Sequence, residues 1–256
     1  MDSHQEANVF IMLRLIEGIL TAAIYIAFTC YIFWPVLFGE RTLLSEGDSV
    51  DQSFMWLSKV FAATRAGQIA LWDFGVMSGT SFIGELQTAA LYPVAWLFGL
   101  IFHPGDQQGF DLIIVAHYLI AALGFHVLCC TLGLSRVGAA IGAVIFAFGS
   151  GIALRSTDQP QLHASLAWLP WVVAATQWSL RTRSFLPSIV GAASAGAFTA
   201  LSFLAGHVHI TIMAVVASLI LAPLAFVDAS SRPQATQAMR RVLLCFSVAI
   251  IFAVAL

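Results

Sequence analysis

The sequence has very few charged residues. Only 9% of its 256 residues are charged, whereas 60% are hydrophobic and the mean hydropathy is +0.91. Soluble domains carry about 25% charged residues, because water has to solvate their surface. The shortage of charge therefore excludes a soluble globular protein of this length, and the net charge of −2 argues against nucleic acid as a partner. The composition predicts a protein solvated by lipid.

Cysteines and processing signals are also scarce. The sequence indicates no disulfide framework, because its four cysteines all lie in apolar segments, where a thiol behaves as a small hydrophobic group: Cys30, Cys129, Cys130 and Cys245. The N-terminus carries Asp2 and Glu6 rather than a basic cluster, and no small-residue cleavage site follows the first apolar run. We therefore expect the first helix to be retained.

Long uncharged runs dominate the rest of the chain. A helix needs about 20 apolar residues to cross the hydrocarbon layer of a bilayer. Runs near this length predict an all-α polytopic membrane protein, with a single transmembrane domain over residues 1–256 and six to seven spans. The expected spans are 18–39, 112–136, 137–154, 164–180, 185–205, 210–227 and a partial span at 242–256, where the sequence stops inside a helix.

A further uncharged run, Leu86–Phe102, is divided by Tyr92-Pro93, and the basic residues decide whether it crosses. If it does not cross, seven basic residues lie on the side of the N-terminus and four on the other: Arg14, Arg136, Arg181, Arg183, Arg232, Arg240 and Arg241 against Arg41, Lys59, Arg65 and Arg155. This bias obeys the positive-inside rule. We therefore expect residues 86–102 to be re-entrant, the N-terminus to be cytoplasmic and the first loop, residues 39–110, to be extracytoplasmic.

The first loop carries two segments with a recognisable pattern. Apolar residues recur at spacings of four, three and four from Val50 to Phe61, which predicts an amphipathic helix in the membrane interface. The segment from Ala70 to Thr80 mixes aromatic residues with glycines, and we expect it to form an irregular loop at headgroup depth with Trp72 in the aromatic belt.

Asp48 is the main catalytic candidate in this loop. It stands directly before the amphipathic helix, where an aspartate commonly serves as an N-cap, with Asp51 at the third helical position. A carboxylate near the lipid surface also takes a proton from an incoming hydroxyl or holds a divalent cation. Gln52 lies one turn further on and faces the same way. The sequence leaves both roles, cap and base, open.

An ordered set of short motifs runs through most of the chain. It begins with Gly47-Asp48-x-x-x-Gln52, Leu71-Trp72-Asp73, Gln87 and Leu91-Tyr92-Pro93. It continues with His117, Leu132-Gly133-Leu134-Ser135-Arg136, Gly138-Ala139, His163, Trp168-Leu169-Pro170-Trp171 and Gly206-His207. In this order, the motifs resemble those of the YfhO-type bacterial membrane proteins of the GT-C class of glycosyltransferases. The stretch after Trp72 departs from the family pattern, which more often has an Asn-Pro-Tyr-like sequence there.

The resemblance implies a GT-C-like fold and transfer of a sugar from a polyprenyl-phosphate-linked donor to a hydroxyl of a lipid, polymer or cell-envelope acceptor. It implies that Asp48 is the general base, or a metal contact where a member uses a metal. It implies substrate-binding roles for Gln52, Trp72, Asp73, Gln87, Tyr92, Arg155, His163 and His207. It also implies that later helices are missing, so we expect this piece alone to be inactive.

The chemistry of transfer assigns roles to some of these residues independently. Arg155 is a candidate for binding a lipid phosphate, since a guanidinium contacts two phosphate oxygens, although arginines at helix ends commonly extend to the headgroups. His163 and His207 lie at the outer ends of their spans. No histidine or carboxylate spacing supports a metal site, so no metal ligands are assigned, and a divalent cation is left open as a cofactor. His117 and His126 lie on different sides of one helix.

Two other classes of membrane protein also fit this pattern of polar and apolar residues. A transporter or lipid flippase also places polar residues among apolar helices, but usually has ionisable residues near mid-membrane and internal repeats, which this sequence lacks. A non-catalytic assembly subunit would use small-residue helices such as 191–200 to pack against a partner. The gathering of nine of the thirteen acidic residues on the expected outer face favours the transferase.

Overall fold

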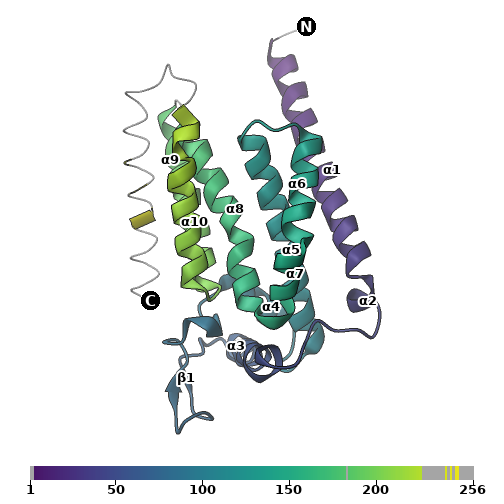
Figure 1. The fold of residues 1–256 in the computed structure, drawn as a ribbon, viewed down its shortest axis with the longest axis vertical. Helices are drawn as coiled ribbons and strands as arrows, with labels where there is room; N and C mark the ends of the chain where they lie inside the picture. Colours follow the sequence, from purple (N-terminus) through teal and green to yellow (C-terminus); the bar gives the residue numbers. More distant parts are fainter. Residues whose placement is uncertain (1–2, 183, 227–239, 241–242, 244–245, 248–256) are drawn as a thin grey trace. The chain divides into compact units, whose positions relative to one another are not determined.

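The protein is almost entirely helical. A computed structural model describes residues 3–182, 184–226, 240, 243, 246 and 247, and within this part of the chain the only strands form one short hairpin (Figure 1). The chain divides into two compact units, residues 1–41 and 42–256, each described here by itself. The arrangement is that of the all-α membrane protein which the composition predicts.

The first unit consists of a long helix and a short one. Helix α1 spans Ser3–Ile32, and α2 spans Trp34–Leu37. The break falls at Phe33, directly before Trp34-Pro35, because Pro35 has no N–H to donate to a carbonyl one turn earlier. The helix of the expected span 18–39 therefore starts earlier in the sequence and ends seven residues sooner than its hydropathy indicates.

The second unit contains the helix bundle. Its helices are α5 Gln107–Thr131, α6 Arg136–Phe148, α7 Ser150–Asp158, α8 Pro160–Arg181, α9 Phe185–Leu204 and α10 Val208–Leu221, followed by the 3₁₀ turn η3 Ala222–Phe226. Among the described residues, four segments are long and apolar enough to cross a membrane, namely 107–131, 136–153, 185–204 and 208–225. They coincide with four of the expected spans and indicate that the protein associates with a membrane.

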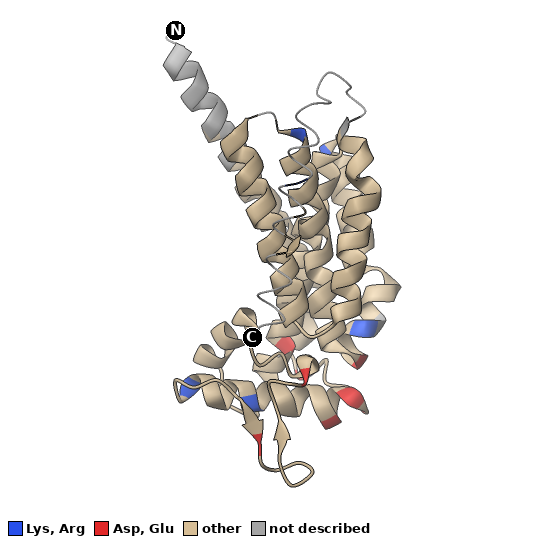
Figure 2. Ribbon diagram, turned by 90° about the vertical axis from the view of Figure 1, so that its left-hand side faces the viewer, with Lys and Arg blue, Asp and Glu red and all other residues tan. Residues whose placement is uncertain are grey.

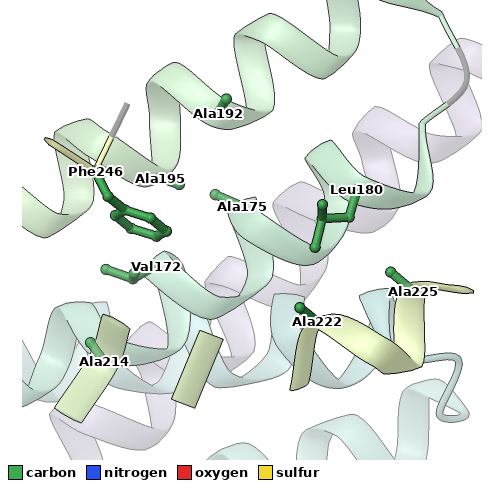
Figure 3. Packing of buried hydrophobic residues seen from close by; sticks show 9 residues of the cluster. All are labelled: Val172, Ala175, Leu180, Ala192, Ala195, Ala214, Ala222, Ala225 and Phe246. Carbon is green, nitrogen blue, oxygen red and sulfur yellow. The ribbon is translucent and has the colours of Figure 1, made fainter. Parts of the chain in front are cut away.

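Helix α8 lies at the centre of the bundle, where it packs against α5, α9 and α10. At 22 residues it is about 33 Å long, but it is more polar than its neighbours because several small polar side chains face other helices rather than lipid. Ser165, Gln177 and Ser179 are all 0% exposed. Figure 3 shows the apolar cluster on one side of α8, where Val172 and Ala175 meet Ala192 and Ala195 of α9.

The first loop forms a layer of short elements at one end of the bundle (Figure 1). These are the π-helical turn η1 Ser49–Phe54, α3 Met55–Arg65, β1 Trp72–Asp73, β2 Thr80–Ser81, η2 Leu86–Thr88 and α4 Pro93–Ile101. We call residues 42–101, which contain these elements, the loop layer. Helix α4 begins at a proline and has nine residues, or about 13 Å, so it is too short to cross a hydrocarbon core of about 30 Å.

Two hydrogen-bonded contacts hold the start of the loop layer against the bundle. Asp111, near the start of α5, accepts hydrogen bonds from the Thr42 hydroxyl at 3.0 Å and the Leu43 N–H at 2.9 Å. The Ser45 hydroxyl donates to the carbonyl of Thr157 in α7 at 2.6 Å. Because these partners lie on two different helices, the chain enters the loop layer along a defined path.

The segment predicted as an irregular loop, residues 70–80, is instead a hairpin. Trp72 pairs with Ser81 and Asp73 with Thr80 in antiparallel register. Its turn places Met77 and Ser78 at positive φ, 49° and 62°, before Gly79 at 114°. The mixture of glycine and aromatic residues concealed this turn, since the paired strands are only two residues long.

The charged residues of the second unit gather at the two ends of its bundle (Figure 2). Its described acidic residues lie at the end that carries the loop layer, and Lys59, Arg65 and Arg155 lie at this end as well. Arg136 and Arg181 lie at the opposite end, where α6 begins and α8 ends, and no described acidic residue of this unit lies there. The expected partial span 242–256 lies outside the described residues except for 243, 246 and 247. Outside them also lie Arg183, Arg232 and Arg241, together with the side chain of Arg14.

Candidate functional site

A partly open pocket lies between the loop layer and the bundle. It encloses about 440 Å³ of empty space, including its mouth. The wall is mostly apolar, and its polar side chains come from five separate segments: Ser53 of η1, Thr88 of η2, Tyr92 before α4, His117 of α5 and Gln161 of α8. Among the catalytic and substrate-binding residues predicted from the sequence, only Tyr92 lines this pocket. The site therefore forms where distant parts of the chain meet.

Tyr92 is at the centre of a hydrogen-bond chain on this wall. Its hydroxyl is 2.7 Å from Nε2 of His117 and accepts a hydrogen bond of 2.7 Å from Nε1 of Trp168. The other imidazole nitrogen of His117, Nδ1, is 2.6 Å from the carbonyl oxygen of Ile113. Tyr92 is 1% exposed and His117 is 2% exposed, so bulk water does not compete for these bonds.

The partners define where each proton lies. The carbonyl of Ile113 only accepts, so Nδ1 of His117 carries the proton and Nε2 is the acceptor. Tyr92 therefore donates its own proton to Nε2 while it receives the Trp168 N–H. Burial raises the pKa of the Tyr92 phenol, and the Trp168 hydrogen bond offsets only part of that effect, so the phenol keeps its proton.

His163, predicted as a substrate ligand, lies next to this chain rather than in it. Its ring is 6.2 Å from that of His117 and 4.5 Å from that of Tyr118, measured between centroids. It is 1% exposed, and neither of its ring nitrogens makes a hydrogen bond of normal geometry, although the Ile114 carbonyl lies close enough to influence it. A buried imidazole without a good partner is costly, because it has lost its hydration.

Asp48 does not form the N-cap that its position in the sequence allows. It already has helical backbone angles, φ −55° and ψ −27°, whereas a capping residue needs extended geometry to reach the free N–H groups. Its side chain makes no capping hydrogen bond, is exposed, and accepts a hydrogen bond of 3.3 Å from Gln52. Ser53 of the same turn faces the pocket. The Asp48 carboxylate thus caps no helix, and the hydrogen bond from Gln52 orients it.

Gln87 and His207 are brought close to each other by the turn between α9 and α10. Gly206 has a φ of +121°, and a Cβ there would lie 3.1 Å from Gln161 Cβ and 3.2 Å from Gln87 Cα. The N–H of His207 donates to Ser165 at 3.0 Å. Burial, and secondarily the neighbouring His209, lowers the pKa of His207 to about 4. The side chain of Gln87 is exposed.

Trp72 and Asp73 stabilise the hairpin by contacts within it and with α3. Asp73 is 7% exposed, forms an ion pair with Lys59 of α3 and accepts the N–H of Gly75 at 2.9 Å. The Lys59 hydrogen bond is the main reason that the pKa of Asp73 is lowered. The Trp72 indole lies over Gly79, where a Cβ would be 2.8 Å from Nε1. These contacts hold the hairpin against α3, and each carboxylate oxygen of Asp73 accepts one of these hydrogen bonds.

Arg155 lies on α7 and pairs with Asp158 one turn later, at 3.3 Å. Both side chains are about half exposed, which makes the pair weak and easily exchanged for another anion. Within the described part of the chain, no three His, Cys, Asp or Glu side chains come together to hold a metal ion.

Ser53 and Gln161 line the pocket, and Trp168 donates a hydrogen bond to Tyr92 of its wall; none of the three was predicted as a site residue. The Ser53 hydroxyl donates to Oε1 of Gln161 at 2.8 Å, across the boundary between the loop layer and the bundle. A signal for Gln161 was present, because it is a polar residue at the start of an apolar helix. Ser53 carries no such signal, since serine is common on the polar face of any amphipathic helix.

Comparison of the chain with family models, with curated proteins and with solved structures found no match in any of the three.

Proposed function

We propose that this chain is part of a membrane glycosyltransferase of the GT-C class. In this proposal it transfers a sugar from a polyprenyl-phosphate-linked donor to a hydroxyl of a lipid, polymer or cell-envelope acceptor. The observation that carries the proposal is the state of Asp48: an exposed carboxylate at the start of η1 that caps nothing and is held by Gln52. Carboxylates without a structural role on a membrane-associated layer are what a general base for an acceptor hydroxyl requires.

The proposed reaction has one bond made and one broken. The Asp48 carboxylate takes the proton of the acceptor hydroxyl while the hydroxyl oxygen attacks the anomeric carbon of the donor sugar. The bond from that carbon to the polyprenyl phosphate breaks, and the phosphate leaves with the electron pair. Arg155, half exposed and paired with the neighbouring Asp158, binds the released phosphate when that pair opens.

The proposal includes an orientation of the protein. The loop layer and its acidic residues face the outside of the cell, and Arg136 and Arg181 at the other end of the bundle face the cytoplasm. The N-terminus is then cytoplasmic, with seven spans including α8 and the partial span at 242–256. Support for this comes from the described acidic residues of the second unit, which lie at the loop-layer end, and from Arg136 and Arg181 at the other end. The short α4, which does not reach across a bilayer, also supports it.

Asparagine at position 48 tests the proposal. It keeps an oxygen that accepts from Gln52 but has no basic carboxylate, so Asp48→Asn should fold normally and lose sugar transfer by about 100-fold or more. The measurement is transfer of labelled sugar from polyprenyl-phosphate donors, in membranes that contain the intact protein. Asp51→Asn is the matched control, because Asp51 is an exposed aspartate on the same turn. Wild-type transfer by Asp48→Asn, or an equal loss in Asp51→Asn, would contradict the role of Asp48.

A transporter is the second candidate, and one observation favours it. His117 and His163 are buried side by side in α5 and α8, and buried imidazoles between membrane helices occur in proton-coupled transporters. The two functions differ in a simple assay: reconstituted protein that moves a solute in response to a pH gradient, and transfers no sugar, is a transporter. A fixed-stoichiometry complex with neither activity would instead indicate an assembly subunit.

A further inference from the structure

The pocket between the loop layer and the bundle has an unused hydrogen-bond acceptor. A phenol oxygen has one proton and two lone pairs. Tyr92 gives its proton to His117 and receives the Trp168 N–H on one lone pair, so its second lone pair has no partner among these contacts. Tyr92 and His117 both line the pocket, and the atoms that join them are Oη and Nε2.

We propose that this pocket binds an apolar single-chain alcohol, whose hydroxyl donates a hydrogen bond to Oη of Tyr92. The inference concerns binding at this pocket and does not depend on sugar transfer or on Asp48.

The hydrogen-bond chain determines the kind of ligand that this wall accepts. Because the proton of Tyr92 is directed at His117, Oη offers the ligand an acceptor and no donor. A ketone or an ether has only acceptor oxygens and makes no hydrogen bond there. An alcohol makes one, in a site where burying an oxygen without a partner is unfavourable.

The rest of the wall determines the shape of the ligand. Most of the lining is aliphatic or aromatic, including Leu57, Phe110, Ile113 and Ile114, which suits a hydrocarbon chain. The space of about 440 Å³ between the lining atoms includes open solvent at the mouth, so the closed part of the pocket is smaller and narrow. One unbranched chain fits this description better than a ring system or a lipid with two chains.

Competition by two isomers, an alcohol and an ether, tests the proposed binding of an alcohol. A photoreactive eight-carbon alcohol, with a diazirine in mid-chain, is cross-linked to the intact protein in detergent and competed with 1-octanol or with 1-methoxyheptane. These competitors have the same atoms, but only the alcohol donates a hydrogen bond. We expect 1-octanol to compete better, and its advantage over the ether to fall by about two- to tenfold in Tyr92→Phe. Detergent partitioning cancels, because it is the same for both proteins.

A control variant addresses the same hydrogen-bond chain from its other side. Trp168→Phe removes the N–H that Tyr92 accepts but leaves Oη as an acceptor and keeps an aromatic ring beside Phe198. It should therefore retain the preference for the alcohol. An unchanged preference in Tyr92→Phe would overturn the inference, as would loss of the preference in Trp168→Phe with Tyr92 intact.

The wild-type protein alone provides a second test that does not depend on the folding of a variant. Mass spectrometry should locate the cross-linked label on pocket residues such as Leu57, Ile113 and Ile114. Label found only on lipid-facing side chains, such as Ile141 and Ile145 of α6, would overturn the proposed site.

Discussion

At the scale of single residues, the two buried histidines differ in how well the fold satisfies them. His117 uses both ring nitrogens, one toward Ile113 and one toward Tyr92. His163 has no hydrogen bond of normal geometry, though it is even less exposed. Unsatisfied buried polar groups are rare in native proteins and are usually kept for a reason other than stability. His163 is therefore the better candidate for a role in function, and His117 for a role in structure.

Leucine substitutions separate these roles. His117→Leu leaves the buried hydroxyl of Tyr92 without its acceptor and should lower the free energy of unfolding by about 1–3 kcal/mol. His163→Leu removes nitrogens that have no good partner and is close in volume, so the melting temperature in detergent should stay the same or rise. Equal destabilisation by the two substitutions would mean that the His163 ring has a strong partner after all.

Residue roles were partly predictable from the sequence. The spacing of Asp48 and Gln52 correctly placed the two side chains within reach of each other. The alternative role of Asp48 as a helix cap is wrong, because the turn at Gly47 lets Asp48 enter the helix before its side chain can reach back. The contacts of Asp73 with Lys59 and with the N–H of Gly75 were not predicted, and its contact with a substrate stays a prediction. These outcomes depend on backbone angles and on neighbours that no local pattern specifies.

At the scale of elements, α8 and α9 pack closely against each other. Ser179 and Ser188 exchange hydrogen bonds, each hydroxyl donating to the carbonyl of the other residue, at 2.8 and 3.1 Å. A Cβ at Gly191 would lie 2.9 Å from Cα of Ser179. Small residues allow two backbones in lipid to approach this closely, and packing then stabilises the pair.

A single methyl group tests this contact. Gly191→Ala should lower the free energy of unfolding by about 1–3 kcal/mol, because the added carbon meets backbone atoms that cannot rotate away. Gly151→Ala in α7 is the matched control: a Cβ there meets nothing within 4 Å, so the better helix propensity of alanine should leave stability unchanged or raise it. Thermal unfolding in detergent measures both, and equal effects would contradict the close packing.

Helix positions followed from hydropathy, but helix ends did not. Proline and glycine moved several boundaries: α1 ends before Trp34-Pro35, α4 begins at Pro93, and α6 is separated from α7 at Gly149, where ψ is 154°. Residues 86–102 were expected to enter the membrane without crossing it, and the nine-residue α4 is compatible with that. The hairpin from Trp72 to Ser81 was missed because its strands are too short for a periodic pattern.

At the scale of the whole molecule, the positions of charged residues at the two ends of the second unit's bundle predict how the bundle lies in a membrane. Its described acidic residues lie at the loop-layer end, and Arg136 and Arg181 lie at the other end. The loop layer holds Glu46, and the turn between α8 and α9 holds Ser184; both side chains are exposed. Because α8 runs the length of the bundle between the two ends, these positions should lie on opposite sides of the bilayer.

Cysteine labelling measures this topology. In a protein whose four native cysteines have been replaced, Glu46→Cys should react with a membrane-impermeant maleimide on intact cells. Ser184→Cys should react only after the membrane is opened. Labelling of both positions from outside would contradict an odd number of crossings between them, and labelling of position 184 alone would reverse the proposed orientation.

The sequence by itself determined that this protein is helical, that it associates with a membrane, and where most of its long helices lie. Hydropathy and charge are properties of short segments, and a bilayer sorts segments by these properties whatever their neighbours are. Only the tertiary structure decided the pocket and its hydrogen bonds. Tyr92 meets a histidine 25 residues away and a tryptophan 76 residues away, and the resulting arrangement of donors and acceptors exists only once α5, α8 and the loop layer have packed together.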